Sequence, residues 1–283
     1  MEIDNVAKVW FITGARRGIG RSITETVLKH GDSVVATTRN ENDLNMAGGY
    51  AGRFLNLRLD VANDTQEQVD NVVKQVIERF GRIDVLVNNA GHGRITNFEE
   101  TSEENIKEIF ELNLFGLMRV TRAVLPIMRK QKNGHIFNIA SAAGYGAGPV
   151  AYHTSKFAVT GFSTCLAFEV EPFGIKVTNV APGLFRTSFY DKGAMRTEID
   201  IHIPDYDKNR WQDDFVANNS HHEQRGNPEK LSELIYKVSS ADNSPLHLPI
   251  GKDAVDTVET FITSLANDVN RWKEEAKNTE YKE

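Results

Sequence analysis

Residues 8–20 of the chain read KVWFITGARRGIG, and this stretch decides the fold. Its first five residues form a short apolar run, as expected of a buried strand. The apolar residues from Ile19 to Leu28 then fall at helical spacing, and Gly31 follows as a stop. Strand, glycine turn and helix in this order are the context that a dinucleotide-binding fingerprint requires.

Three glycines shape this turn, at Gly14, Gly18 and Gly20. Glycine has no Cβ, so the backbone can approach a pyrophosphate closely, and the helix N-terminus adds amide donors and a favourable dipole. The spacing is G-x-x-x-G-x-G, which differs from the G-x-G-x-x-G of the common fingerprint. The turn therefore indicates nucleotide binding, with a plain glycine-rich turn as the alternative.

A second pattern, YHTSK at residues 152–156, lies in a predicted helix. Tyr152 and Lys156 are four residues apart, so both lie on one helix face. A phenol titrates near ~10, and an ammonium beside it favours the phenolate and lowers its pKa. The pair thus predicts a general acid/base, although Tyr-x-x-x-Lys also occurs by chance on solvated helices.

Two further apolar runs end in glycine-containing turns, IDVLVNNAG at 83–91 and KVTNVAPG at 176–183. Together with the glycine turn, Asn113, Ser141 and Tyr-x-x-x-Lys, they strongly resemble the short-chain dehydrogenase/reductase family. The resemblance runs in unbroken order over residues 7–190. It implies an enzyme that moves a hydride between a nicotinamide cofactor and a carbonyl or alcohol.

Strands and helices alternate along the chain, and apolar strands joined by crossover helices predict a parallel sheet covered on both faces. We expect an α/β fold: a doubly wound, Rossmann-like, mostly parallel seven-stranded sheet with helices on both faces, in one domain over residues 1–283. Pro249 cannot sit in a central strand, which places the last strand at an edge. The predicted strands are 8–12, 33–37, 54–59, 83–87, 135–140, 175–180 and 246–250, and the predicted helices are 18–30, 41–47, 64–80, 101–131, 151–172, 228–239 and 253–276.

The resemblance implies a role for each of four residues. Tyr152 would exchange a proton with the substrate oxygen, and Lys156 would lower the pKa of the phenol and hold the nicotinamide ribose. Ser141, at the carboxyl edge of a strand, would position the substrate oxygen. Asn113 would anchor a water that connects Lys156 to solvent. Taken alone, Ser141 could be a turn serine, and Asn113 could satisfy a local carbonyl.

The end of the second strand, VATTR at 35–39, indicates which cofactor is used. An enzyme for the unphosphorylated cofactor has Asp or Glu there to hold the ribose 2′-hydroxyl. This chain has Arg39 instead, with Arg17 in the glycine turn, and guanidiniums suit a 2′-phosphate. We therefore expect NADP(H), with two ordinary solvated arginines as the alternative. The full predicted cofactor set is Gly14, Arg16, Arg17, Gly18, Ile19, Gly20, Arg39, Asp60, Val61, Asn88, Ala90, Gly91, Tyr152, Lys156, Pro182, Gly183 and Thr187.

The stretch 184–227 is too long and too apolar for a solvated linker, and its charged residues exclude a wholly buried segment. It predicts a mobile lid over a bulky, apolar carbonyl substrate, with a permanently packed subdomain as the alternative. Trp211 and Phe215, four residues apart, are expected on its apolar face. The predicted substrate residues are Ser141, Tyr145, His92, Phe185 and Phe189.

Composition excludes several other functions. A net charge of −6 argues against nucleic acid or an anionic membrane as a partner, and no apolar run is long enough to cross a bilayer. The N-terminus lacks a signal peptide and Cys165 is the only cysteine, so we expect a cytoplasmic protein without an internal disulfide. The adjacent His221 and His222 do not predict a metal site. Residues 273–283 are expected to form a charged tail.

The sequence thus predicts an NADP-dependent oxidoreductase that interconverts a ketone or aldehyde and its alcohol. Helices 101–131 and 151–172 are expected to pair into a homodimer or homotetramer. Two alternatives remain: a non-catalytic NADPH-binding or scaffold protein on the same fold, and an epimerase- or dehydratase-type relative. The latter carries G-x-x-G-x-x-G and a larger C-terminal region, so the glycine spacing speaks against it.

Overall fold

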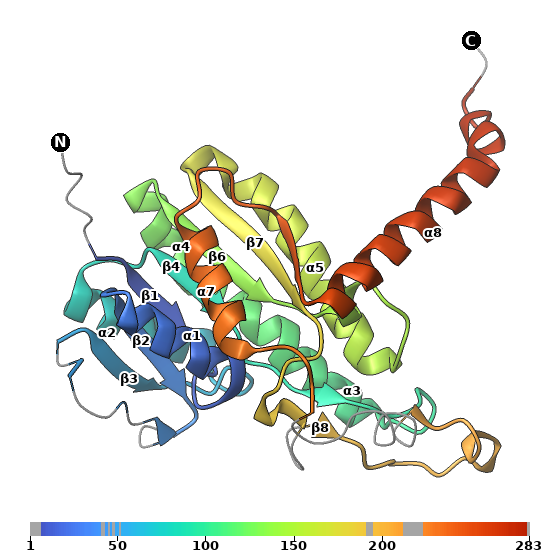
Figure 1. The fold of residues 1–283 in the computed structure, drawn as a ribbon, viewed down its shortest axis with the longest axis horizontal. Coiled ribbons are helices and arrows are strands. Elements are labelled where there is room, and N and C mark those ends of the chain that lie inside the picture. Colours follow the sequence, from blue (N-terminus) through green and yellow to red (C-terminus); the bar gives the residue numbers. More distant parts are fainter. Residues whose placement is uncertain are drawn as a thin grey trace.

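The computed structural model of the chain describes residues 7–40, 43–44, 46, 49–50, 52–190, 195–211 and 223–281. Its centre is a parallel seven-stranded sheet in the order β3-β2-β1-β4-β6-β7-β9 (Figure 1). This is the predicted doubly wound, Rossmann-like fold. The strands are β1 Val9–Ile12, β2 Ser33–Thr38, β3 Phe54–Arg58, β4 Val85–Asn88, β6 Gly134–Ile139, β7 Ile175–Pro182 and β9 His247–Ile250.

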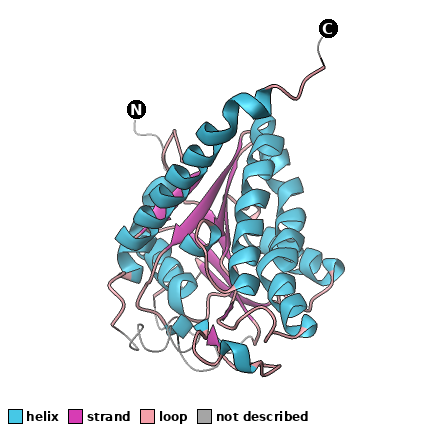
Figure 2. Ribbon diagram, turned by 90° about the vertical axis from the view of Figure 1, so that its right-hand side faces the viewer, coloured by secondary structure: helices cyan, strands magenta, loops and turns pink. Residues whose placement is uncertain are grey.

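Helices cover both faces of the sheet, which is seen between them in Figure 2. The alternation of side chains along β1 shows why: Val9 and Phe11 pack on one face, Trp10 and Ile12 on the other. The first face carries α2 (Gln66–Phe80), α4 (Leu117–Gln131) and α5 (Val150–Val170). The second face carries α1 (Gly18–Lys29) and α7 (Pro228–Ser239). Both faces of β1 are therefore apolar, as its continuous apolar run in the sequence predicts.

The structure decides several local predictions. Pro249 lies in the edge strand β9, as expected. The predicted helix 101–131 is three consecutive segments: α3 Glu103–Phe110, a π-helical turn Glu111–Gly116, and α4. The predicted helix at 41–47 is wrong where it can be checked, because its described residues form no α-helix. Residues 273–277 of the predicted tail continue the last helix, α8 Lys252–Lys277, with exposed side chains.

One further pair of strands was missed. β5 (Gly93–Arg94) pairs in parallel with β8 (Met195–Arg196) to form a two-stranded sheet beside the main one. Two-residue strands carry no hydrophobic periodicity, so nothing in the sequence marked them. No helix in the described part of the chain is long and apolar enough to span a bilayer.

The π-helical turn brings Gly116 against the loop after β3. A Cβ at Gly116 would lie 2.2 Å from the carbonyl oxygen of Val61. Since the obstacle is backbone, it cannot rotate away. Only glycine fits at this point, and the close approach holds the π-helical turn beside the site described below.

Gly116→Ala should therefore lower the free energy of unfolding by about 1–3 kcal/mol, as overpacking does. The matched control is Gly161→Ala in α5, where an added Cβ meets nothing within 4 Å. There the change should be neutral or stabilising by about 0.5–1 kcal/mol, because alanine favours the helix. Urea denaturation of both variants measures the difference, and equal stabilities would contradict the close-contact argument.

Candidate active site

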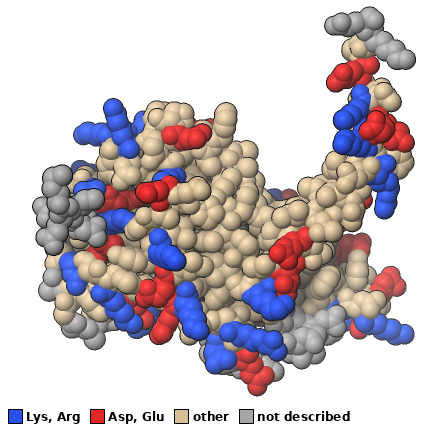
Figure 3. Space-filling view, turned by 45° about the horizontal axis from the view of Figure 1, so that its top comes forward, with Lys and Arg blue, Asp and Glu red and all other residues tan. Residues whose placement is uncertain are grey.

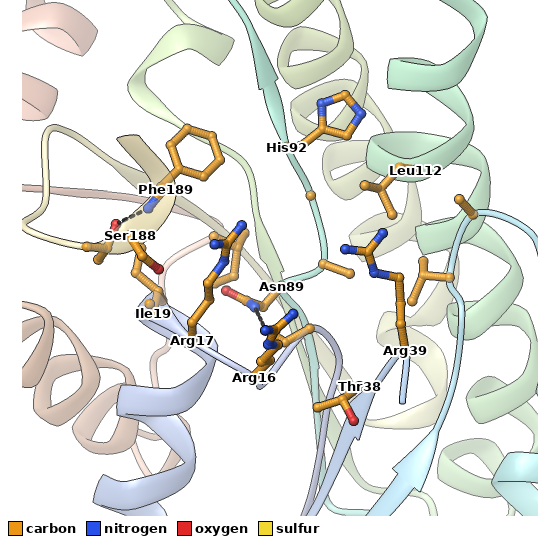
Figure 4. A pocket seen from close by; sticks show the side chains of 18 of the residues that line it. Arg16, Arg17, Ile19, Thr38, Arg39, Asn89, His92, Leu112, Ser188 and Phe189 are labelled. Carbon is orange, nitrogen blue, oxygen red and sulfur yellow. Dashed lines mark hydrogen bonds between the residues drawn. The ribbon is translucent and has the colours of Figure 1, made fainter. Parts of the chain in front are cut away.

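A cavity of about 330 Å³ opens at the carboxyl ends of the strands. The glycine turn, the end of β2, the loops after β3, β4 and β7, and the start of α5 all contribute to its wall (Figure 4). Most of the predicted cofactor residues meet here. They are Gly14, Arg16, Arg17, Gly18, Ile19, Arg39, Asp60, Val61, Ala90, Gly91, Tyr152, Lys156, Pro182, Gly183 and Thr187.

The glycine turn fits a phosphate group. Gly14 and Gly18 have φ of 65° and 59°, a left-handed conformation that favours glycine. Helix α1 begins at Gly18, and neither a side-chain cap nor an acidic residue occupies its first turn. Its first backbone N–H groups therefore remain available to an anion in the cavity.

Two predicted cofactor residues do not line the cavity. Asn88 is buried in β4, and its amide donates to the side chains of Thr121 and Asn138, at 2.9 Å each. Its neighbour Asn89 lines the cavity instead and donates to the carbonyl oxygens of Thr13 (2.9 Å) and Gly14 (3.0 Å). The sequence pointed to the wrong asparagine because successive side chains at a strand end face opposite ways.

Gly20 also lies behind the wall of the cavity. A Cβ there would come within 2.4 Å of the Asn89 amide nitrogen and 2.8 Å of the Gly14 carbonyl oxygen. The glycine thus lets α1 pack closely on the turn, and it does not touch the cavity. Its place in the motif is explained by packing.

Tyr152 and Lys156 both lie in α5 and are buried, at 8% and 5% exposure. The Lys156 ammonium donates to the carbonyl oxygen of Ile139 at 3.0 Å and lies 5.9 Å from the centre of the Tyr152 ring. Ser141 follows the end of β6 on the same side of the cavity. The three side chains thus share one wall.

Burial is the largest influence on the pKa values of Tyr152 and Lys156. It raises the pKa of Tyr152 to about 12, and a hydrogen bond from Ser141 offsets part of the rise. It also lowers the pKa of Lys156 to about 8. The phenol is therefore protonated at neutral pH. That Lys156 lowers the pKa of the Tyr152 phenol stays a prediction, because the Lys156 ammonium donates to a backbone carbonyl and not to the phenol.

Asn113 lies behind the cavity in the π-helical turn and is almost fully buried. Its oxygen accepts from the backbone N–H of His92 at 3.1 Å, and its amide donates to the His92 carbonyl (3.1 Å) and to Ser155 Oγ (3.0 Å). Ser155 in turn donates to the carbonyl of Tyr152 at 2.7 Å. Asn113 therefore joins the loop after β4 to the helix that carries Tyr152. π-helical turns within α-helices often occur at functional sites.

Three arginines, Arg16, Arg17 and Arg39, project into the cavity from the glycine turn and the end of β2 (Figure 4). The carboxylates of Asp43 and Asp60 line the same region, and Arg16 lies 3.7 Å from Asp43. The residue at the end of β2 is Thr38, whose hydroxyl donates to the carbonyl of Asn40 at 2.6 Å. No carboxylate thus occupies the strand end itself.

The predicted substrate residues His92, Phe185 and Phe189 also line the cavity. The Phe189 ring lies 6.2 Å from that of Tyr152. Tyr145, also predicted there, does not line the cavity: it is buried between β7 and α8, and its hydroxyl is 2.6 Å from His247 Nδ1. Tyr145 directly follows the 3₁₀ turn Ala142–Gly144, and this turn directs its side chain away from the cavity.

Residues 195–211 of the predicted lid are firmly attached to the body. Besides the β5–β8 pair, three ion pairs hold this segment, which we call the cap. Arg196 pairs with Glu108 at the cavity wall, buried Arg94 pairs with Asp200 (2.8 Å), and Arg210 pairs with fully buried Glu100 (2.9 Å). Sequence reasoning missed these pairs, because each joins residues about 90 to 110 positions apart. Phe215, His221 and His222 lie outside the described residues.

Comparison with known proteins agrees with this geometry. The family model for short chain dehydrogenases matches residues 8–196. The chain belongs to the short-chain dehydrogenase family. It is 37% identical to Oxidoreductase BOA17 of Botryotinia fuckeliana, over 95% of this chain and 98% of the relative. It is 35% identical to 3-ketodihydrosphingosine reductase of Bacteroides thetaiotaomicron, over 86% and 88%.

A solved structure shows the same fold. The crystal structure of a short-chain dehydrogenase from Streptomyces avermitilis superimposes with a TM-score of 0.87, at 37% identity, covering 97% of this chain and 99% of that one. As a member of this family, the chain is an oxidoreductase. The described residues contain no cluster of three or more His, Cys, Asp or Glu side chains that could hold a metal ion.

The lowered pKa of Lys156 predicts how the stability of the protein depends on pH. Between its folded-state pKa of about 8 and the ~10.4 of an unfolded lysine, the unfolded state binds more protons. The free energy of unfolding should therefore rise with pH in this window. Relative to Lys156→Met, the wild type should gain about 1–3 kcal/mol between about pH 8 and about pH 10.5.

Urea denaturation at several pH values measures this gain, with the exposed Lys130→Met as control. A wild-type minus Lys156→Met difference that does not change with pH would contradict the effect of burial. Above about pH 10 the raised pKa of Tyr152 acts in the opposite direction, because the folded state then binds the extra proton.

Proposed function

We propose that this protein is an NADP(H)-dependent oxidoreductase that interconverts a ketone or aldehyde and its alcohol, with Tyr152 as general acid/base. One observation carries the proposal. Tyr152, Ser141 and Lys156 line the same cavity as the glycine turn. A proton donor therefore lies next to a surface that fits a dinucleotide.

In the proposed reaction, the nicotinamide supplies or accepts the hydride when the cofactor is bound. Ser141 donates a hydrogen bond to the substrate oxygen, and Tyr152 gives that oxygen its proton during reduction or removes it during oxidation. Lys156 holds the nicotinamide ribose and supports the phenolate that Tyr152 becomes. Asn113 keeps the segments that bear His92 and Tyr152 in register and is proposed to anchor a water that leads from Lys156 to solvent.

NADP(H) is proposed over NAD(H) because of charge. Arg16, Arg17 and Arg39 outnumber the carboxylates of Asp43 and Asp60 in this region of the cavity. Arg16 faces Asp43, which leaves Arg17 and Arg39 as the candidates for a 2′-phosphate. The strand end that would hold a free 2′-hydroxyl bears Thr38 in place of an acid.

The proposed substrate is a bulky, mostly apolar carbonyl compound. Phe185 and Phe189 line the cavity, and the Phe189 ring lies 6.2 Å from that of Tyr152. The relative named as a 3-ketodihydrosphingosine reductase acts, by its name, on a long-chain ketone. We propose that the stretch 184–227 forms the substrate cover. The ion pairs of residues 195–211 favour a packed cap over a mobile lid for that part.

Two alternatives are less well supported. A non-catalytic NADPH-binding protein would have no need of a buried Tyr–Lys pair with Ser141 in the same wall. An epimerase or dehydratase would carry a different glycine spacing. A cytoplasmic homodimer or homotetramer, paired through α4 and α5, remains part of the proposal. The exposed Phe115 and Phe168 on this side of the molecule are consistent with it.

Tyr152→Phe removes only the hydroxyl, so turnover should fall by about 10²–10⁴-fold while the fold and NADPH affinity stay nearly unchanged. NADPH consumption with a panel of carbonyl compounds, graded by size and apolarity, measures turnover, and fluorescence titration measures affinity. The control is Tyr206→Phe, because Tyr206 is in the cap and does not line the cavity. Activity of Tyr152→Phe within threefold of wild type would refute the assignment.

The wild type should prefer NADPH over NADH by tens to a thousandfold in kcat/KM, since charge-assisted hydrogen bonds contribute roughly 1.5–3 kcal/mol each before discounting for solvent. Arg17→Ala with Arg39→Ala should remove most of this preference, more so at low salt. Arg21→Ala is the matched control, because Arg21 is on α1 outside the cavity and pairs with Glu25. Equal kcat/KM with NADPH and NADH in the wild type would show that the arginines do not recognise the 2′-phosphate.

A further inference from the structure

The last helix, α8, leaves the body of the molecule. In Figure 1 it points away from the rest of the molecule, toward the C-terminus. Only its first turns are packed: Ala254 and Val258 are buried, and the Phe261 ring contacts Tyr145 and Phe157. Every residue from 262 to 277 is exposed. A free helix of this length is marginally stable in water, so this half of α8 needs a partner.

The exposed half carries an apolar stripe at alternating spacings of three and four residues. The stripe consists of Ile262, Leu265, Val269, Trp272 and Ala276, and we call it the seam. The four large side chains are 58%, 54%, 56% and 62% exposed. This spacing is the 3.5-residue repeat of a coiled coil, with Ile262, Val269 and Ala276 at a positions and Leu265 and Trp272 at d positions.

The residue types favour a second copy of this chain as the partner. Two of the three a positions are β-branched and one d position is Leu, a pattern that favours parallel two-stranded coils. In such a pair, a g residue faces the e residue five positions later on the partner. Asp268 would then face Lys273 of the other copy, and this pair is complementary in charge.

A lipid surface fits less well. Acidic side chains outnumber basic ones in α8, whereas helices that lie on anionic membranes are rich in Lys and Arg. Figure 3 shows acidic and basic side chains side by side on the outer part of the helix. Such mixing suits a helix pair flanked by ion pairs.

We propose that the seam of α8 pairs in parallel with the same seam of a second copy of this chain, beginning at Ile262 where contact with the body ends. The contact is isologous, because each copy offers the same stripe. It is independent of the cavity and of the proposed pairing through α4 and α5. Two heptads make a short coil, so the test uses a readout that traps the pair.

The test is disulfide trapping in full-length protein that carries Cys165→Ser, so that the introduced cysteine is the only one. Leu265→Cys places the thiol in the seam, and Asn267→Cys, two residues away on the outer face, is the matched control. Under mild oxidation Leu265→Cys should form a covalent dimer at least tenfold faster than Asn267→Cys. Equal rates would overturn the proposal. Carbonyl reduction within twofold of wild type confirms that both variants are folded.

A charge exchange tests the parallel arrangement. In the Leu265→Cys protein, Asp268→Lys or Lys273→Asp alone should slow trapping about threefold at low salt, because each creates like charges across the pair. Both changes together should restore the rate to within twofold. If the two changes together do not restore the trapping rate, the proposed parallel pairing of the seams is wrong. Flotation of the wild type with phosphatidylserine vesicles, lost in Leu265→Asp, would overturn the choice of partner.

Discussion

A row of three asparagines across the sheet fixes the position of α5, the helix that carries Tyr152 and Lys156. Asn88, Asn138 and Asn179 are register partners on β4, β6 and β7, and all are almost fully buried. Asn88 donates to Thr121 of α4 and to Asn138, Asn138 donates to Ser163 of α5, and Asn179 donates to Thr160 of α5. Buried amides need partners, so this row permits only one placement of α4 and α5 on the sheet. Tyr152 and Lys156 are carried by the helix so placed.

The same placement creates the electrostatics of the site. Once α5 is held close to the sheet, the Lys156 side chain is buried to 5% exposure and its ammonium has the Ile139 carbonyl as its partner. A desolvated ammonium titrates closer to neutral pH, and a desolvated phenol keeps its proton. The two side chains thus have pKa values shifted in opposite directions by one cause, burial. A tyrosine that is reliably protonated near neutral pH suits the role of a proton donor to a carbonyl.

The fold could be predicted because its signals are local and repeated. Three of the apolar strands, β1, β4 and β7, end in glycine-containing turns, and one proline at 249 was enough to identify an edge. The fine structure of the site could not be predicted, because it depends on side-chain direction and on distant partners. Asn88 and Asn89 are indistinguishable in the sequence, yet one stabilises the interior and the other holds the glycine turn. The direction of the Tyr145 side chain depends on a 3₁₀ turn that has no recognisable sequence pattern.

The cap shows most clearly what sequence reasoning lacks. The length, apolar residues and interleaved charges of 184–227 suggested a mobile lid, but two of those charges, Asp200 and Arg210, pair with the buried Arg94 and Glu100. Glu100 is fully buried and forms an ion pair with Arg210. The hydrogen bond from the Arg210 guanidinium holds the pKa of the Glu100 carboxyl below its usual range. Removing one partner of a buried pair costs about 3–5 kcal/mol, and opening this segment would separate Arg94 from Asp200 as well. The segment 195–211 is therefore expected to stay fixed, and Arg196 is its residue that lines the cavity. Since Arg196 is held there by Glu108 and by the β5–β8 pair, it is a position at which selectivity between substrates can be built on this fold.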